Sequence, residues 1–150
     1  MARLLIVHHT PSPATAELLD AVIRGASDPE ITGVEVVRRA ALAATASDVL
    51  ECDGLVLGTP ANIGYMSGAL KHFFDTVYYP CLDATVGLPY GVYVHGNDDT
   101  AGALNAIQRI TGALRWKQVA APLSLIGAPG KDDLEAVREL AATVAVSLEG

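Results

Sequence analysis

The sequence has little cysteine and no long apolar run. Its two cysteines, Cys52 and Cys81, are too few for a disulfide framework and have no metal-ligand spacing, so we expect two buried free thiols. The apolar run at residues 4–7 is short and is not followed by a cleavage site, and no stretch is long enough to span a bilayer. These absences predict a soluble, cytoplasmic protein without membrane insertion.

Basic residues are also scarce. Lys and Arg number 10 against 17 Asp and Glu, which gives a formal net charge of -7. Because nucleic-acid binding depends on clustered Lys and Arg, nucleic acid is not an expected partner. A chain of 150 residues has the usual size of one domain. We therefore expect a single domain over residues 1–150, and its 51% hydrophobic composition is compatible with a homodimer.

The sequence alternates short apolar runs with helical periodicity. The apolar runs are unbroken, which is typical of parallel strands buried on both faces. We expect five such strands, at residues 4–7, 34–37, 55–57, 92–94 and 119–126. Amphipathic stripes predict the helices between and after them, at residues 18–23, 43–50, 66–77, 104–114 and 134–144. With right-handed crossovers, this order predicts a doubly wound, three-layer α/β sandwich.

In sheets of this kind, ligands bind beyond the carboxyl ends of the strands. Three connections there form the candidate site: a first loop, HHTPSPAT at residues 8–15, a second loop, GTPANIGYM at residues 58–66, and a third loop, HGNDDTAG at residues 95–102. No third ligand stands at a recognisable spacing from the histidines of these loops, so we expect no metal site.

The first loop is rich in hydroxyl groups. Thr10, Ser12 and Thr15 precede a helix expected to start near Ala14, and hydroxyls with free backbone N–H groups at a helix start can bind an anion. The alternative is that one hydroxyl only caps the helix. Because the loop contains no Lys or Arg, a bound phosphate would be held by neutral donors and the helix dipole.

The second loop is longer than most strand-to-helix connections. Its glycines, with Pro60 and Asn62, allow a sharp turn and a close approach to a flat ligand, and Ser67 is expected to cap the next helix. An aromatic ring beside the loop is a natural stacking surface for a planar heterocycle. The candidates for this stacking are Tyr65, Tyr78 and Tyr79.

The third loop combines a turn with two carboxylates. Gly96 and Asn97 form the turn, and Asp98 or Asp99 is expected as the helix N-cap. His95 ends the preceding strand at the same edge of the sheet. The residues leave two roles open for His95, either a hydrogen-bonded structural residue or a wall of the site.

The segment GTPANIGYMSGALKHFFD resembles the second flavin loop of flavodoxin-like proteins, above all the NAD(P)H:quinone oxidoreductases and NADPH-dependent FMN reductases. The family pattern is G-T-P-x-x-x-G-x-M-x-x-x-x-K-x-F-x-D. The matching residues here are Gly58, Thr59, Pro60, Gly64, Met66, Lys71, Phe73 or Phe74, and Asp75. The first loop similarly resembles the family's phosphate loop, and HGN resembles its third loop.

This resemblance implies a flavodoxin-like fold with strand order 2-1-3-4-5 and bound FMN, with NAD(P)H as co-substrate. The implied FMN-binding residues are Thr10, Ser12, Ala14, Thr15, Pro60, Ala61, Asn62, Ile63, Gly64, Tyr65, His95, Gly96 and Asn97. The chain departs from the family at Pro13, which stands where the phosphate loop usually has glycine, and at Pro11. Each proline removes one N–H donor, which weakens a phosphate site unless that donor was unused.

Three functions remain open. The first is an NAD(P)H-dependent oxidoreductase that passes electrons through FMN to a quinone or similar small-molecule acceptor. The second is a flavodoxin-type one-electron carrier that serves a redox partner protein, and the third is a binding module without FMN. A phosphoacceptor receiver domain is excluded, because such domains need acidic residues where this chain has His8, His9, Gly58 and Thr59.

Overall fold

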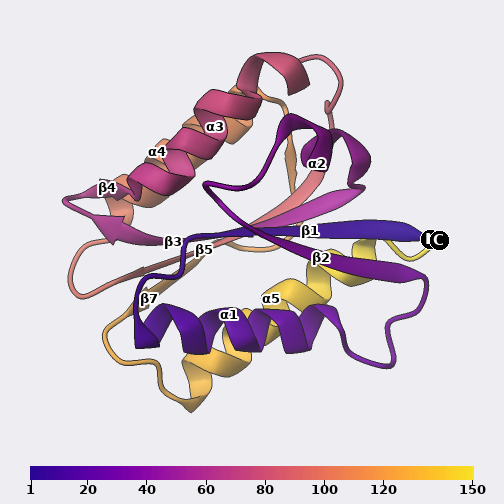
Figure 1. Ribbon diagram of the computed structural model, residues 1–150. Helices are drawn as coiled ribbons and strands as arrows, with labels where there is room; N and C mark the ends of the chain where they lie inside the picture. The colour runs from indigo at the N-terminus through magenta and orange to yellow at the C-terminus, as the bar shows by residue number, and fades with distance from the viewer.

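A twisted sheet divides the helices into two layers (Figure 1). In the computed structural model, which describes residues 1–150, the strands run in the order β2-β1-β3-β5-β6, and β7 also pairs with β5. The strands of this parallel sheet are β1 (Ala2–His8), β2 (Val34–Ala40), β3 (Gly54–Asn62), β5 (Pro89–Gly96), β6 (Lys117–Gln118) and β7 (Leu123–Ile126). Since β6 and β7 together take the fifth place, the predicted three-layer sandwich and the order 2-1-3-4-5 are confirmed.

The last predicted strand is interrupted, so the expectation of one continuous strand at residues 119–126 was wrong. Gln118 pairs with Tyr90, whereas Leu123 pairs with Tyr93, so the outer chain has two more residues than β5 between these pairs. Pro122 lies in this interval and has no N–H to donate to a strand ladder. The result is two short edge strands.

The helices form where the apolar stripes predict them. On one face lie α1 (Pro13–Ala26) and α5 (Lys131–Ser147), and on the other lie α2 (Ala46–Glu51), α3 (Gly68–Cys81) and α4 (Ala101–Ala113). The predicted cap at Ser67 is confirmed, since its Oγ accepts a hydrogen bond from the N–H of Leu70 at 3.2 Å. The short helix α2 starts later than expected because Thr45 and Asp48 form a capping box there.

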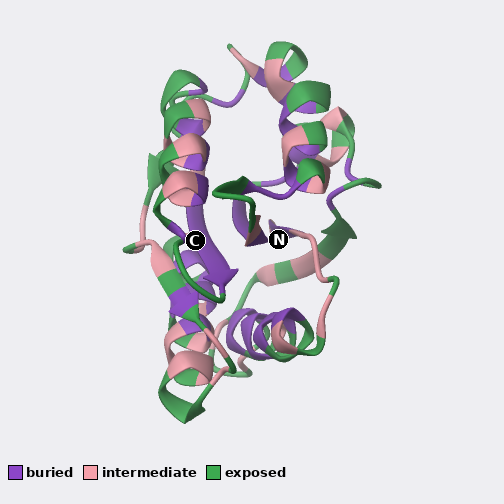
Figure 2. Ribbon diagram, turned by 90° about the vertical axis from the view of Figure 1, so that its left-hand side faces the viewer, coloured by how far each residue is buried: buried purple, intermediate pink, exposed green.

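Buried side chains fill both spaces between sheet and helices. Figure 2 shows purple residues along the central strands and on the helix sides that face them. On the side of α3, the ring centroid of Phe74 lies 5.3 Å from that of Phe73 and 6.3 Å from that of Trp116. Both cysteines are free and buried, as predicted, and burial raises the pKa of Cys52 to about 12, which keeps this thiol protonated.

None of the helices is long and apolar enough to cross a bilayer. The carboxyl ends of β1, β3 and β5 point to one edge of the sheet, on the left in Figure 1, while both chain ends lie at the opposite edge. The three loops of the candidate site therefore meet at one edge.

Candidate functional site

The first loop closes around the start of α1. Ser12 is the N-cap residue: its Oγ accepts from the N–H of Thr15 at 3.2 Å, and Thr15 Oγ1 accepts from the N–H of Ser12 at 3.1 Å. Two of the three predicted hydroxyls thus form a capping box, which is the structural alternative raised by the sequence. The third, Thr10 Oγ1, lies 2.7 Å from Nδ1 of His8.

Pro13 still leaves a backbone N–H group at the start of α1 free to bind a ligand. Pro13 is the first residue of α1, a position where an N–H has no partner within the helix. The N–H of Ala14 is therefore the first that α1 presents to a ligand. Nδ1 of His9 is buried and has no hydrogen-bond partner, so this loop holds an unsatisfied polar atom. Both groups fit a ligand with hydrogen-bonding oxygens.

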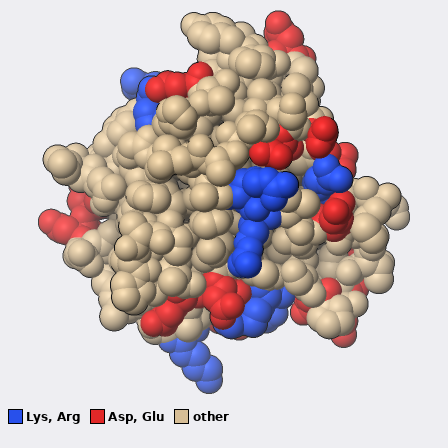
Figure 3. All heavy atoms as spheres, in the orientation of Figure 1, with Lys and Arg blue, Asp and Glu red and all other residues tan.

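A basic residue lies near the first loop although the loop contains none. Arg38 stands on β2, opposite Ile6 in the register of β1; burial lowers the pKa of His8, and the charge of Arg38 lowers it further. Figure 3 shows a strip of Lys and Arg atoms on the face that carries β2. The loop itself contains no Lys or Arg, and the pairing of β2 with β1 brings this cation near it from a strand distant in sequence.

The second loop is a β-hairpin. Strand β3 continues to Asn62, which pairs with Tyr65 in the short antiparallel strand β4 (Tyr65–Met66). The two residues between them have positive φ, 50° at Ile63 and 74° at Gly64, as a two-residue type I′ turn requires. The sharp turn expected from the sequence is present, but the short strand β4 that follows it was not predicted.

This hairpin rests on the start of α4. A Cβ atom placed on Gly102 would lie only 2.0 Å from the carbonyl oxygen of Gly64. Glycine at position 102 therefore lets the helix backbone approach the hairpin turn closely. The third loop ends in this same contact, so the second and third loops are held together.

A cavity of about 290 Å³ lies between these two loops. Its size is close to the lower end, about 300 Å³, of the range for small-molecule sites. Its lining residues are Ala61, Ile63, Gly64, Gly96, Asn97, Asp98 and Asp99. The structure thus brings five predicted residues together, and it adds two carboxylates that sequence reasoning assigned only to helix capping.

An aspartate of the third loop accepts a hydrogen bond from the start of α4, as predicted, but this aspartate is not the N-cap residue. The N-cap residue of α4 is Thr100, and its side chain makes no capping bond. Oδ1 of Asp99 instead accepts a hydrogen bond from the N–H of Ala101 at 2.8 Å. Asp99 therefore satisfies one free donor of the helix while it lines the cavity.

Several predicted residues lie around the cavity or away from it. Tyr65 is exposed on the hairpin, whereas His95 is buried, its Nε2 2.8 Å from the carbonyl oxygen of Gly127, and neither lines the cavity. Tyr78 and Tyr79 lie near the end of α3, about 15 Å from its start at a rise of about 1.5 Å per residue. The interpretation that these two tyrosines flank the second loop was wrong.

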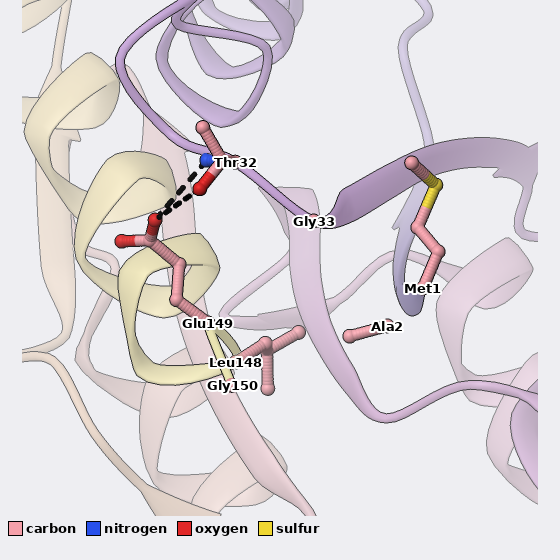
Figure 4. A pocket seen from close by; sticks show the side chains of 7 residues that line it. All are labelled: Met1, Ala2, Thr32, Gly33, Leu148, Glu149 and Gly150. Atoms are coloured by element: carbon pink, nitrogen blue, oxygen red, sulfur yellow. Dashed lines mark hydrogen bonds between the residues drawn. The ribbon is translucent and has the colours of Figure 1, made fainter.

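A larger cavity, of about 410 Å³, lies at the opposite edge of the sheet, between the chain ends (Figure 4). Its carboxylate, Glu149, already accepts hydrogen bonds from the N–H and the hydroxyl of Thr32, at 3.1 and 3.3 Å. The start of α1 and the hairpin lie at the other edge. The cavity between the second and third loops is therefore the better candidate site.

Replacing Ile63 with asparagine should raise the free energy of unfolding by about 1 kcal/mol. Ile63 is fully exposed, so little packing is lost, and asparagine tolerates a positive φ that is strained for a β-branched residue. Urea denaturation measures the change. The control is Ile63→Val, which keeps the branched side chain and should give no gain; equal stability of both variants would contradict an effect of backbone strain.

Comparison with known proteins finds both a family match and a sequence relative. A family model described as NADPH-dependent FMN reductase matches residues 14–130. Over 77 residues, the chain is 38% identical to a flavodoxin of Aquifex aeolicus (strain VF5); the match covers 51% of this chain and 40% of that flavodoxin. The chain thus matches less than half the length of this relative.

Solved structures show the same fold. A flavodoxin from Streptococcus pneumonia TIGR4 is 21% identical with a TM-score of 0.81, over 98% of this chain and 100% of that one. A flavodoxin from the domain Archaea is 15% identical with a TM-score of 0.84, over 99% of both chains. A WrbA-like protein from Agrobacterium tumefaciens is 19% identical with a TM-score of 0.77, over the whole of both chains. At these identities, the likeness establishes the fold.

Proposed function

The chain belongs to the NADPH-dependent FMN reductase family, a flavodoxin-like family that binds FMN, and we propose that it transfers electrons from NAD(P)H through FMN to a quinone or similar small acceptor. The observation that carries this proposal is the cavity between the second and third loops, at the same sheet edge as the start of α1. In our proposal, the flavin ring lies in this cavity and the phosphate lies on the first loop.

The residues at the first loop suit a phosphate. The N–H of Ala14 and the positive end of the α1 dipole face a ligand there, and Thr10 adds a hydroxyl. His9 adds a buried nitrogen that has no partner within the protein. We propose that Ser12 and Thr15 act mainly by holding the loop in shape, because their hydroxyls are already used in the capping box.

The residues at the cavity suit a planar ring. When bound, FMN supplies the hydride and single-electron chemistry, so the protein's task is to bind, orient and shield. The exposed Ile63 and Tyr65 on the hairpin can cover the ring edge, and the backbone of Gly96 and Asn97 bounds the other side. Asp98 and Asp99 place negative charge beside the cavity, which disfavours further negative charge there.

These carboxylates support a second candidate, a one-electron carrier. Negative charge beside the flavin disfavours its anionic reduced form and so lowers the reduction potential of the flavin. A low potential suits a protein that passes electrons to a redox partner protein. The similarity to a flavodoxin over half of the chain favours this reading as well. The proposed FMN site is the same in both candidates.

Titration of the cofactor-free protein with FMN, followed by quenching of flavin fluorescence, tests the proposal. We expect saturable binding at micromolar or tighter affinity, and weaker binding of riboflavin, which lacks the phosphate. Absence of FMN binding at tens of micromolar would favour the binding module without FMN. Anaerobic mixing with NADPH or NADH then separates the candidates: a reductase is bleached within seconds, whereas a carrier stays oxidised.

A further inference from the structure

His8 is the last residue of β1 and the first residue of the first loop, and its side chain makes one hydrogen bond within that loop. Its Nδ1 lies 2.7 Å from Thr10 Oγ1, and this is the only hydrogen bond that the structure gives to either side chain. His8 is half-buried, and its other ring nitrogen, Nε2, has no protein partner. Nothing in the protein therefore fixes which ring nitrogen carries the proton.

The position of that proton decides what Thr10 can do. If Nδ1 is unprotonated, it accepts the hydroxyl hydrogen of Thr10, and the hydroxyl cannot donate to a ligand. If Nδ1 carries the hydrogen, it donates to Thr10 Oγ1, and the hydroxyl hydrogen is free to point elsewhere. Only the second arrangement presents a donor to an anion on the first loop. The hydrogen bonds from His8 to Thr10 and from Thr10 to the anion would then form a chain, in which each bond strengthens the other.

The surroundings of His8 keep its ring neutral in the free protein. Burial lowers the pKa of His8, and the charges of Arg38 on β2 and of the neighbouring His9 lower it further. These two are the charged or titratable groups that act on His8, and no carboxylate is among them. A neutral ring has two tautomers, and a ligand bound at the loop can determine which of them His8 adopts.

We propose that His8 is a positioning residue for the phosphate of FMN: the bound phosphate selects the form of His8 that has a hydrogen on Nδ1, and this form turns the Thr10 hydroxyl toward the phosphate. The inference rests on the proposed function, because it takes the first loop as the phosphate site. It adds His8 to the residues expected to act on the phosphate, and it gives the His8–Thr10 hydrogen bond a direction that depends on the ligand.

The direct test is ¹⁵N NMR of histidine-labelled protein, which distinguishes a protonated from an unprotonated Nδ1. We expect FMN to shift His8 toward the form with hydrogen on Nδ1, and riboflavin to leave the ring nearly unchanged. The variant Thr10→Val removes the coupling and should abolish the FMN-induced shift. An unchanged His8 signal in the FMN complex of the natural sequence overturns the proposal.

Two variants of His8 give a second readout. His8→Leu keeps a side chain of similar size but leaves the Thr10 hydroxyl without an orienting donor, so FMN affinity should fall about fivefold, the effect of roughly one hydrogen bond. His8→Asn supplies an amide N–H near the place of Nδ1 and should keep affinity within about twofold. Riboflavin affinity should not change in either variant.

The outcomes separate this inference from the proposed function. If the natural sequence binds FMN no more tightly than riboflavin, the first loop is not a phosphate site and both proposals fail. If it prefers FMN but His8→Leu keeps the same preference, the proposed FMN site stands and the role of His8 is rejected. The NMR measurement needs only the natural sequence, so it decides even if a His8 variant fails to fold.

Discussion

Replacing Gly102 with alanine is expected to weaken FMN binding by at least about tenfold, which is about 1.4 kcal/mol of binding free energy. The new Cβ would lie 2.0 Å from the carbonyl oxygen of Gly64, and real Cβ atoms essentially never come within 3.0 Å of such an atom. The hairpin or the start of α4 must therefore move by about 1 Å. This movement changes the cavity between the second and third loops, because both loops meet at this contact.

The matched control for Gly102→Ala is Gly112→Ala in the same helix. A Cβ on Gly112 meets no atom within 4 Å, so this change should leave FMN affinity unaltered and raise the free energy of unfolding by up to about 1 kcal/mol. Gly102→Ala should instead lower stability by about 1 to 3 kcal/mol. Fluorescence titration and urea denaturation measure the two effects. Equal FMN affinities of both variants would show that the hairpin contact does not shape the site.

Replacing Phe74 with alanine is expected to lower the free energy of unfolding by about 3 to 5 kcal/mol. Phe74 is fully buried between the sheet and α3, where it packs against Phe73 and Trp116. Its loss removes a large apolar surface and leaves a cavity that the neighbouring rings can fill only in part. Because domains are typically stable by about 5 to 15 kcal/mol, this is a large part of the total.

Tyr79, five residues further along α3, provides the control for the Phe74 substitution. Its side chain is 82% exposed, so Tyr79→Ala should change stability by no more than about 0.5 kcal/mol. Thermal and urea denaturation of both variants give the comparison. A loss of less than about 1 kcal/mol in Phe74→Ala would mean that α3 is not packed on the sheet as described.

The order of elements could be predicted from the sequence because it depends on local patterns. Buried parallel strands require unbroken apolar runs, and helices packed on one face require apolar residues at helical spacing. The break between β6 and β7 was missed, although Pro122 was visible, because the apolar residues on both sides of it continue the run. A proline indicates that one backbone hydrogen bond is missing, but only the pairing with β5 shows that the chain leaves the sheet between Gln118 and Leu123.

The hairpin of the second loop was missed for a different reason. A two-residue type I′ turn is usually signalled by Asn-Gly or Asp-Gly, whereas here Ile63 precedes Gly64. A β-branched residue at positive φ contradicts local preference, so no sequence signal pointed to this turn type. The contact of Gly102 with Gly64 helps to hold the turn, and this contact joins segments that are far apart in the sequence.

By itself, the sequence determined the fold class, the strand order through family resemblance, and the three loops of the candidate site, because these follow from local apolar patterns and short motifs. Only the tertiary structure decided which groups face one another there. Pairing of β2 with β1 brings Arg38 near His8, and the bend of the first loop brings His8 to Thr10. The first contact depends on strand register and the second on loop geometry, and neither can be predicted from an apolar pattern or a short motif.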